Sequence, residues 1–432
     1  MRLETIAALL LLLCSCAAGA GKYVGSAEAD RAALERARAA VDKVRKSDAV
    51  VLVLGPGGKP VAGAEVVVRQ RESDFKVGCN IFGFDRFATA AQNEEYKRRF
   101  AEIFDFATLP FYWKSYEPVR GQPQHAYREK VARWCAEHGI VTKGHPLAWT
   151  HPAGVPDWTK NLNPLESLAE LERRVRECVA HFAGLIDIWD VVNEPTHTKN
   201  WPGTKDRVDY VERALRWAHE ANPNATLVVN EYYVIQDMEG RGPFFNLVRE
   251  LLRRGAPIGA IGMQCHEPRS DWYPLDMVEK TLAAYAQLGL PIQITEFTPT
   301  SSGKPITGNY RQGTWTEQAQ ADYAEQFLRI CFAQPAVRAV IWWDLCEAKA
   351  WLPGGGLLDK QLRPKEIFRR VKKLVREEWR TNITLRTDAN GRAKFRGFHG
   401  AYTITARHGG RSAAATGRIR PGETAQFTLR LR

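Results

Sequence analysis

The chain has 432 residues, of which 44% are hydrophobic and 25% charged, proportions that exclude a disordered or collagen-like protein. Its formal charge of +12 comes from lysines and arginines that look scattered, with no dense basic tract and no zinc-finger spacing, so we expect no nucleic-acid partner. Thirteen tryptophans are a high number, and tryptophan serves both in large cores and in clefts where aromatic faces stack on sugars.

Residues 1–20 have the features of a signal peptide. The apolar run Ile6–Leu13 is too short to span a bilayer, and Ala18-Gly19-Ala20 offers a small-residue cleavage site. Leu13-Cys14-Ser15-Cys16 also loosely resembles a bacterial lipobox, so a membrane anchor on a lipidated Cys16 stays open as an alternative. We therefore expect an exported protein that is periplasmic, extracellular or lipid-anchored at the cell surface.

The remaining cysteines show no metal-binding spacing. Several of them lie in strand-like apolar runs, which favours buried thiols, although one disulfide is compatible with export. They are Cys79, Cys135, Cys178, Cys265, Cys331 and Cys346. The sequence predicts no metal and no organic cofactor.

Two segments outside the central part of the chain carry short strand signals. Within residues 21–47, Ala27–Lys46 reads as a charged helix, because no Gly or Pro interrupts it. Val50–Leu54 and Val61–Val68 then flank a Gly/Pro turn, which predicts a strand pair within residues 48–72. Residues 381–432 contain four further candidates: Ile383–Arg386, Ala393–Phe395, Tyr402–Ala406 and Thr424–Leu431.

Between these segments, residues 73–380 alternate regularly between strand and helix patterns. The strand candidates are Lys76–Ile81, Phe104–Leu109, Val141–Leu147, Ile186–Val192, Thr226–Asn230, Ile258–Met263, Ile292–Ile294 and Ala339–Trp343. Helical patterns follow most of them, from Glu94–Glu102 to Lys365–Glu378. Eight such units predict an α/β fold, a (β/α)8 TIM barrel. A doubly wound open sheet is the alternative, but no Gly-rich phosphate loop follows the first strand.

Barrel active sites lie at the carboxyl ends of the strands, where this sequence places acids, amides, histidines and tryptophans. The residues expected there are His145 and Trp149 (third strand), Asn193 and Glu194 (fourth), Gln264 and His266 (sixth), Glu296 (seventh), and Trp343 and Trp351 (eighth). Two carboxylates on either side of a glycosidic bond are the minimum equipment for its hydrolysis. A single glutamate at a strand end is as readily a salt-bridge partner, but the pair with its amide and histidine neighbours favours catalysis.

Three motifs in this region resemble the glycoside hydrolase family 10 barrel, over roughly residues 75–380. Asp190-Val191-Val192-Asn193-Glu194-Pro195 matches the acid/base motif of that family. Gly262-Met263-Gln264-Cys265-His266 matches its sixth-strand motif, with Cys265 where Gly is usual, and Ile294-Thr295-Glu296-Phe297 matches its nucleophile strand. The usual activity of the family is endo-1,4-β-xylanase.

The resemblance implies a role for each of these residues. Glu194 would be the acid/base and Glu296 the nucleophile of a retaining reaction, with their carboxyl groups about 5–5.5 Å apart. Asn193 would hydrogen-bond the sugar 2-hydroxyl, and His266 would hold the ionised nucleophile with Gln264 nearby. The remaining expected binding residues are His145, Trp149, Trp343 and Trp351 around the attacked sugar and Tyr232, beside Asn230, on the leaving-group side.

The sequence departs from the family after the second strand. Thr108, Leu109 and Tyr112 stand where Glu, Asn and Lys usually bind the next sugar, and Lys349 stands where Asp is common. Because a site built for hydroxyl groups discriminates through them, this change alters substrate preference more than it alters cleavage.

The two flanking segments together resemble a carboxypeptidase-regulatory-like β-sandwich. Gly58-Lys59-Pro60-Val61-Ala62-Gly63-Ala64 precedes the barrel, and Thr387-Asp388-Ala389-Asn390-Gly391 and Gly400-Ala401-Tyr402 follow it. The sequence thus predicts a barrel inserted into a small accessory sandwich, which would serve as a structural brace or bind carbohydrate.

The leading hypothesis is an exported, monomeric, retaining hydrolase that cleaves internal β-1,4 linkages of xylan-type plant polysaccharide. Two alternatives stay open: a retaining enzyme that acts on a different glycan, and a catalytically silent glycan-binding protein.

Overall fold

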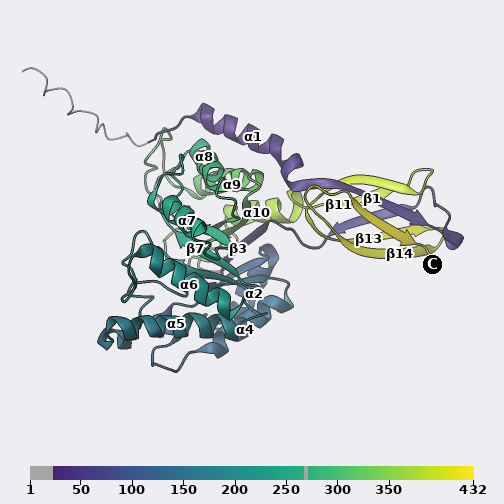
Figure 1. The fold of residues 1–432 in the computed structure, drawn as a ribbon. Coiled ribbons are helices and arrows are strands. Elements are labelled where there is room, and N and C mark those ends of the chain that lie inside the picture. The colour runs from purple at the N-terminus through teal and green to yellow at the C-terminus, as the bar shows by residue number, and fades with distance from the viewer. Residues whose placement is uncertain (1–22, 267–270) are drawn as a thin grey trace, which may run out of the picture.

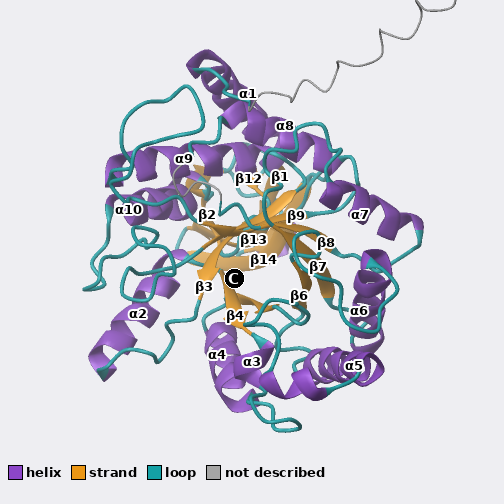
Figure 2. Ribbon diagram, turned by 90° about the vertical axis from the view of Figure 1, so that its left-hand side faces the viewer, coloured by secondary structure: helices purple, strands orange, loops and turns teal. Residues whose placement is uncertain are grey.

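The centre of the molecule is a closed barrel of eight parallel strands, seen from the side in Figure 1 and along its axis in Figure 2. The computed structural model describes residues 23–266 and 271–432, so the predicted signal peptide lies outside the described residues. The strand order is β10-β3-β4-β5-β6-β7-β8-β9. Their bounds are β3 Lys76–Asn80, β4 Phe106–Pro110, β5 Val141–His145, β6 Ile188–Asn193, β7 Thr226–Glu231, β8 Ala260–Met263, β9 Ile292–Phe297 and β10 Val337–Trp342.

Helices surround the barrel (Figure 2). They are α2 Ala90–Ile103, α3 Trp113–Tyr116, α4 His125–Glu137, α5 Pro164–His181, α6 Arg207–Ala221, α7 Pro243–Arg253, α8 Leu275–Ala286, α9 Glu317–Ala333 and α10 Glu366–Lys373, and one π-helical turn, Leu374–Glu378, continues α10. Local signals start several of them: α5 begins with a capping box between Asn163 and Glu166 and has Pro164 at its first position. The predicted (β/α)8 barrel is confirmed.

The barrel interior changes from apolar to polar along the strands. Phe106 and Ile188, at the starts of β4 and β6, pack with Ile341 of β10, the three coming from alternate strands. Because strand residues two apart share a face, Thr108 and Asp190 come next on β4 and β6. The polar residues of the site therefore rest on an apolar floor.

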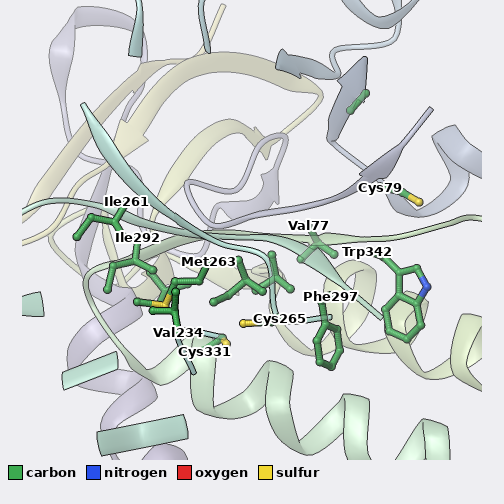
Figure 3. Packing of buried hydrophobic residues seen from close by; sticks show 14 of the residues in the cluster. Val77, Cys79, Val234, Ile261, Met263, Cys265, Ile292, Phe297, Cys331 and Trp342 are labelled. Atoms are coloured by element: carbon green, nitrogen blue, oxygen red, sulfur yellow. The ribbon is translucent and has the colours of Figure 1, made fainter. Parts of the chain in front are cut away.

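The main core fills the layer between the strands and the helices (Figure 3). Phe297 of β9 stacks on Phe327 of α9 at 4.2 Å and meets the ring of Trp342 edge-on at 5.3 Å. Trp342 therefore points outward into this core, as expected for a neighbour of the inward Trp343. The six cysteines that the structure describes are buried, and none of them forms a disulfide.

The flanking segments form two further sheets, which pack together beside the barrel (Figure 1). One sheet has the order β12-β1-β15, and the other has the order β11-β2-β13-β14. The strands are β1 Lys46–Leu54, β2 Glu65–Gln70, β11 Asn382–Arg386, β12 Arg392–Phe398, β13 Gly400–His408, β14 Arg411–Ile419 and β15 Ala425–Arg430. We call this unit the flanking sandwich.

The predicted pairing of the two N-terminal strands is wrong. β1 pairs with β12 and β15, whereas β2, which begins four residues later than expected, pairs with β11 and β13. Only a single bridge between Leu54 and Pro60 joins the segments on either side of the turn. Pairing each N-terminal strand with C-terminal strands buries both apolar faces in one core, which contains Val51, Val66, Ile404 and Phe427.

Helix α1 (Ala27–Arg45) runs along the barrel, from its mouth to the flanking sandwich (Figure 1). At its start, Asp30 accepts a hydrogen bond from Leu275 N at the beginning of α8. At its end, the Arg45 guanidinium donates to the carbonyl oxygens of Phe332 (2.6 Å), Gln334 (2.7 Å) and Val337 (2.9 Å). Burial lowers the pKa of Arg45 to about 10, so the side chain stays charged at neutral pH and caps the carbonyl end of α9.

Candidate active site

Glu194 follows β6 directly and has both carboxylate oxygens engaged. Trp149 donates its indole N–H to Oε2 at 2.8 Å, and the Gln264 amide donates to Oε1 at 3.0 Å. The donors come from the ends of β5 and β8, so three strand ends converge on this one carboxyl group.

Glu296, within β9, is 5% exposed and is held just as closely. Its Oε1 accepts from Asn230 Nδ2 at 2.8 Å, and His266 Nε2 lies 2.8 Å from Oε2. His145 Nε2 lies 3.9 Å from Oε1. The nucleophile candidate is thus positioned by hydrogen bonds and by two imidazoles.

Asn193 connects the two carboxyl groups through their amide donors. Its Oδ1 accepts from Asn230 Nδ2 at 2.9 Å and from Gln264 Nε2 at 3.3 Å. Thr295 Oγ1 donates to Asn230 Oδ1 at 2.6 Å, which fixes the Asn230 amide with its nitrogen toward Glu296. Both glutamates are therefore held in one rigid polar network.

A buried ion pair supports His145 from below. Lys143 and Asp190 are fully buried, with Nζ 2.9 Å from Oδ2, and the same oxygen lies 2.8 Å from His145 Nδ1. The partner on Nδ1 orients the ring so that Nε2 faces Glu296.

His266 has a second partner on its far side. Its Nδ1 lies 2.9 Å from Thr298 Oγ1, and that hydroxyl donates its proton to the carbonyl oxygen of Glu296 at 2.8 Å. The hydroxyl therefore accepts from His266, and Nδ1 is a donor. His266 is therefore fixed from both sides, by Thr298 at Nδ1 and by Glu296 at Nε2.

The environments of the two glutamates move their pKa values in opposite directions. Burial raises the pKa of Glu194, and the negative charges of Glu296 and Glu231 add to this effect. Burial also acts to raise the pKa of Glu296, but the charge of His145 and the hydrogen bond and charge of His266 outweigh it and lower the value to about 2. One group is thus suited to carry a proton while the other is ionised.

Aromatic rings line the cleft on the side of β10, β3 and β4. Trp343 lies 5.5 Å from the ring of His145 and 6.0 Å from that of His266. Trp351 is 55% exposed, and its ring lies 4.9 Å from His266. Trp343 and Trp351 thus both border the pair of imidazoles, where an aromatic wall was expected.

The altered residues after the second strand differ in where they point. Thr108 and Leu109 are completely buried, Thr108 on the interior face of β4 next to Phe106 and Leu109 on the opposite face in the main core. Tyr112 lies in the cleft, with ring centroids 5.6 Å from His145, 5.9 Å from Trp149 and 5.9 Å from Phe82. Burial and the charge of Glu296 raise the pKa of Tyr112 well above its ordinary value, so its hydroxyl stays protonated.

On the opposite side, Tyr232 lies over His197 with the rings stacked at 4.0 Å. His197 Nδ1 lies 2.8 Å from the buried Glu231, which also accepts from Thr196. Thr196, His197, Tyr232 and Tyr233 line a hollow of about 400 Å³. This position is compatible with the leaving-group side assigned to Tyr232.

The backbone is strained where these side chains are presented. Glu194 has φ 55° and Cys265 has φ 58°, in the left-handed region that residues other than glycine seldom adopt. The value at Cys265 explains why glycine suits this position. Such outliers gather at functional sites, where the surrounding structure holds them in place.

Sequence reasoning missed the support given by Lys143, Asp190 and Thr298, and gave Asn230 no separate role. Lys143 and Asp190 had a usable signal, since charged residues inside apolar strands of a parallel barrel require a partner. Thr298 had none, because threonine is ordinary in a loop. Within the described ranges, no three His, Cys, Asp or Glu side chains cluster as metal ligands would, and no helix there is long and apolar enough to cross a membrane.

Comparisons with known proteins agree with this geometry. The family model of glycosyl hydrolase family 10 matches residues 73–374. Endo-1,4-beta-xylanase B of Thermotoga neapolitana is 31% identical over 283 residues, which cover 62% of this chain and 78% of that protein. Endo-1,4-beta-xylanase 2 of Arabidopsis thaliana is 29% identical over 383 residues, which cover 87% of this chain but 34% of the plant protein, so the chain spans about a third of that relative.

Among solved structures, xylanase 10B from Thermotoga petrophila in complex with xylobiose is 26% identical, with a TM-score of 0.60, over 71% of this chain and 95% of the other. Native xylanase 10B from Thermotoga maritima is similar to the same extent, with 26% identity and a TM-score of 0.59.

Proposed function

Because the chain belongs to glycosyl hydrolase family 10, we propose that it is a retaining glycoside hydrolase that cleaves internal β-1,4 linkages of a xylan-type polysaccharide. The observation that carries this proposal is the pair of glutamates with opposite pKa shifts, held in one network of amides. A binding protein has no need for a protonated and an ionised carboxyl group at the same bond.

In the first step, ionised Glu296 attacks the anomeric carbon while Glu194 transfers its proton to the glycosidic oxygen. The bond between the anomeric carbon and that oxygen breaks, and the leaving sugar departs as an alcohol. A covalent ester between the sugar and Glu296 forms. Asn230 and His266 hold the attacking carboxylate in place, and Trp149 and Gln264 do the same for the acid.

In the second step, Glu194, now ionised, takes a proton from water while the water oxygen attacks the anomeric carbon. The ester bond breaks, and Glu296 and Glu194 return to their starting protonation states. Two displacements restore the original β configuration. The expected carboxyl separation of about 5–5.5 Å belongs to this mechanism and stays a prediction.

The residues specify the reaction more closely than the substrate, and one observation favours a second candidate substrate. Thr108 and Leu109 are buried, and Tyr112 presents an aromatic ring where polar groups were expected. Loss of hydrogen-bonding groups to a sugar changes preference strongly, so a non-xylan β-glycan is the alternative substrate.

The deciding experiment is reducing-sugar release from glucuronoxylan, arabinoxylan, mixed-linkage glucan and cellulose by residues 21–432, with Glu296→Ala as control. We expect cleavage of xylan with a β-anomeric product by NMR, and no cleavage by the variant. Activity on another polymer alone would select the second candidate. Binding without any cleavage would leave a silent glycan-binding protein.

We further propose that the protein is exported, on the strength of Ile6–Leu13 and the small residues after it. Mass spectrometry of the mature N-terminus distinguishes the two routes. Cleavage after Ala20 supports a secreted form, and a diacylated Cys16 supports a lipid anchor. An intact Met1 would contradict both. The likeness of the flanking sandwich to carboxypeptidase-regulatory-like domains is proposed on its motifs alone.

A further inference from the structure

Two thirds of the net positive charge of the protein comes from its last strands. Residues 381–432 contain ten Lys or Arg and two Asp or Glu, a net charge of +8 out of +12. The basic residues themselves are scattered, as expected, and the excess here arises because this segment has so few acidic residues. Residues 381–432 are about an eighth of the chain, and all of them belong to the flanking sandwich or its turns.

The outer face of the β12-β1-β15 sheet collects part of this charge in one place. On β12, Arg392 and Lys394 are exposed on the same side, because they are two residues apart. Their partners across β1 are Leu52 and Val50, and those residues pair in turn with Thr428 and Gln426 of β15. Arg430 follows Thr428 on the same side of β15.

The result is a strip three strands wide, about 10 Å across, with cations on both edges and aliphatic groups in the middle. We call it the basic strip, and it consists of Val50, Leu52, Arg392, Lys394, Thr428 and Arg430.

The side-chain charges of the three cations of the basic strip are not paired with a carboxylate in the described part of the chain, although the backbone N–H of Arg392 donates to Asp388 Oδ1 at 2.9 Å. Within residues 23–266 and 271–432, Arg392, Lys394 and Arg430 form no ion pair. Their neighbours behave differently: Arg396 pairs with Asp42 and Asp48, and Arg418 pairs with Glu72. A cluster of uncompensated cations beside aliphatic side chains attracts a polyanion that also has apolar C–H surface.

We infer that the basic strip binds an anionic polysaccharide, a glycan chain that carries uronic-acid carboxylates. A glycan fits better than a nucleic acid or a lipid surface, because the same chain contains a barrel of a polysaccharide-hydrolase family. The choice of probe rests on the proposed function, but the binding does not require catalysis.

The position of the flanking sandwich determines what such binding does. It joins the barrel before β3 and after α10, at the amino ends of the strands, whereas Glu194 and Glu296 lie at the carboxyl ends (Figure 1). One short oligosaccharide does not occupy both. The basic strip therefore tethers the enzyme to a polymer while the mouth acts on another stretch or another chain, which raises the local substrate concentration.

The test uses the full chain with Glu296→Gln, so that no probe is hydrolysed. Binding is measured by affinity electrophoresis against glucuronoxylan and against the same polymer after carboxyl reduction. The test variant adds Arg392→Gln, Lys394→Gln and Arg430→Gln. The matched control adds Arg386→Gln, Arg407→Gln and Arg411→Gln, exposed residues of the other sheet that remove the same charge.

We expect binding to glucuronoxylan that weakens with salt, falls about tenfold or more in the test variant and is nearly kept in the control. Equal binding to the carboxyl-reduced polymer would overturn the anionic ligand. Equal loss in both variants would overturn the assignment to this face. Tighter binding to duplex DNA or to phosphatidylglycerol vesicles than to glucuronoxylan would overturn the polysaccharide as partner.

Catalysis is followed separately on a soluble aryl xylobioside with the three strip substitutions in an otherwise unchanged chain. We expect unchanged turnover of this small substrate, since the basic strip is remote from the mouth. Failure of the unsubstituted enzyme on every xylan would count against the proposed function and leave the binding result intact.

Discussion

The mouth of the barrel and the basic strip use charged side chains in opposite ways. In the mouth, Glu296 is almost completely buried and is held by Asn230 and His266. On the strip, Arg392 and Lys394 are exposed on an outer sheet face and form no ion pair among the described residues. A buried charge is costly unless every side of it is satisfied, whereas an exposed one costs little and is screened by salt. The comparison separates charge that is fixed for chemistry from charge that is available for association.

Removal of the nucleophile should have the largest effect. Glu296→Gln keeps the size of the side chain but removes the attacking oxygen anion, so we expect kcat to fall by about 10⁵-fold or more. Reducing-sugar assays measure the loss, and circular dichroism confirms that the fold is kept. Retention of more than a few per cent of the activity would show that another group attacks the sugar.

Substitution of the acid, Glu194, should lower the activity less than substitution of Glu296, and the loss should depend on pH. Activity rises as Glu296 ionises, near its pKa of about 2, and falls when Glu194 loses its proton above the ordinary glutamate range. Glu194→Gln should lower kcat/KM on xylan by about 10²–10⁴-fold and abolish the alkaline limb of the profile. With an aryl glycoside that has a good leaving group, Glu194→Gln should slow the first step less than it does with xylan. An unchanged alkaline limb would assign the acid role elsewhere.

The buried ion pair between Lys143 and Asp190 should contribute more to the stability of the fold than an exposed ion pair does. Asp190→Ala leaves Lys143 buried without its partner, and we expect about 3–5 kcal/mol less unfolding free energy in urea titrations. Adding Lys143→Met should recover part of the loss. Asp157→Ala, which breaks the exposed pair with Lys160, is the matched control and should barely change the midpoint. Similar losses of unfolding free energy in Asp190→Ala and Asp157→Ala would mean that burial of the ion pair does not determine the size of the loss.

Arg45 is a case intermediate between the buried charges of the mouth and the exposed charges of the basic strip. It is buried, but its hydrogen-bond partners are carbonyl oxygens alone. Arg45→Met should cost about 2–3 kcal/mol, because several carbonyl groups at the end of α9 lose a charged donor. We expect this loss in an unfolding transition. Small-angle scattering should show that the flanking sandwich separates from the barrel in the same transition. Full stability with an unchanged envelope would show that the aromatic contacts of Phe75 and Trp379 are sufficient.

Substitutions in the basic strip should have the smallest effect on the unfolding free energy. Arg392→Gln, Lys394→Gln and Arg430→Gln together should change the unfolding free energy by less than about 0.5 kcal/mol, because exposed side chains away from caps and networks contribute little. Thermal unfolding of the triple variant measures this. A large destabilisation would make the strip a structural feature rather than a binding surface.

The barrel and its reactive groups could be predicted from sequence because each strand end carries a compact motif. Asn193 and Glu194 adjoin each other, and alternation of strands and helices fixes where their side chains gather. The supporting contacts could not be predicted in the same way. That Thr298 receives the far nitrogen of His266 depends on two strand ends meeting in space, which no local pattern encodes.

The strand pairing of the flanking sandwich was harder to predict from the sequence, for a physical reason. Its strands are short, and a Gly/Pro turn between two apolar runs is the usual signal of a hairpin. The chain at Leu54 does turn back at Pro60, but β2 then crosses to the other sheet, because both N-terminal strands gain more partners from β11–β15 than from each other. The excess of net positive charge in residues 381–432 can be read from the sequence by counting charges segment by segment.

β2 and β11 are antiparallel neighbours, and Gln70 donates its backbone N–H to Thr381 at 3.1 Å. The link between these two strands, elsewhere often a short turn, here contains the entire barrel of about 310 residues. During synthesis at about 5–20 residues per second, β1 and β2 wait roughly 15–60 s for their first partners. The barrel must therefore fold beside two unpaired apolar strands, and the last fifty residues to leave the ribosome complete a unit that was begun first.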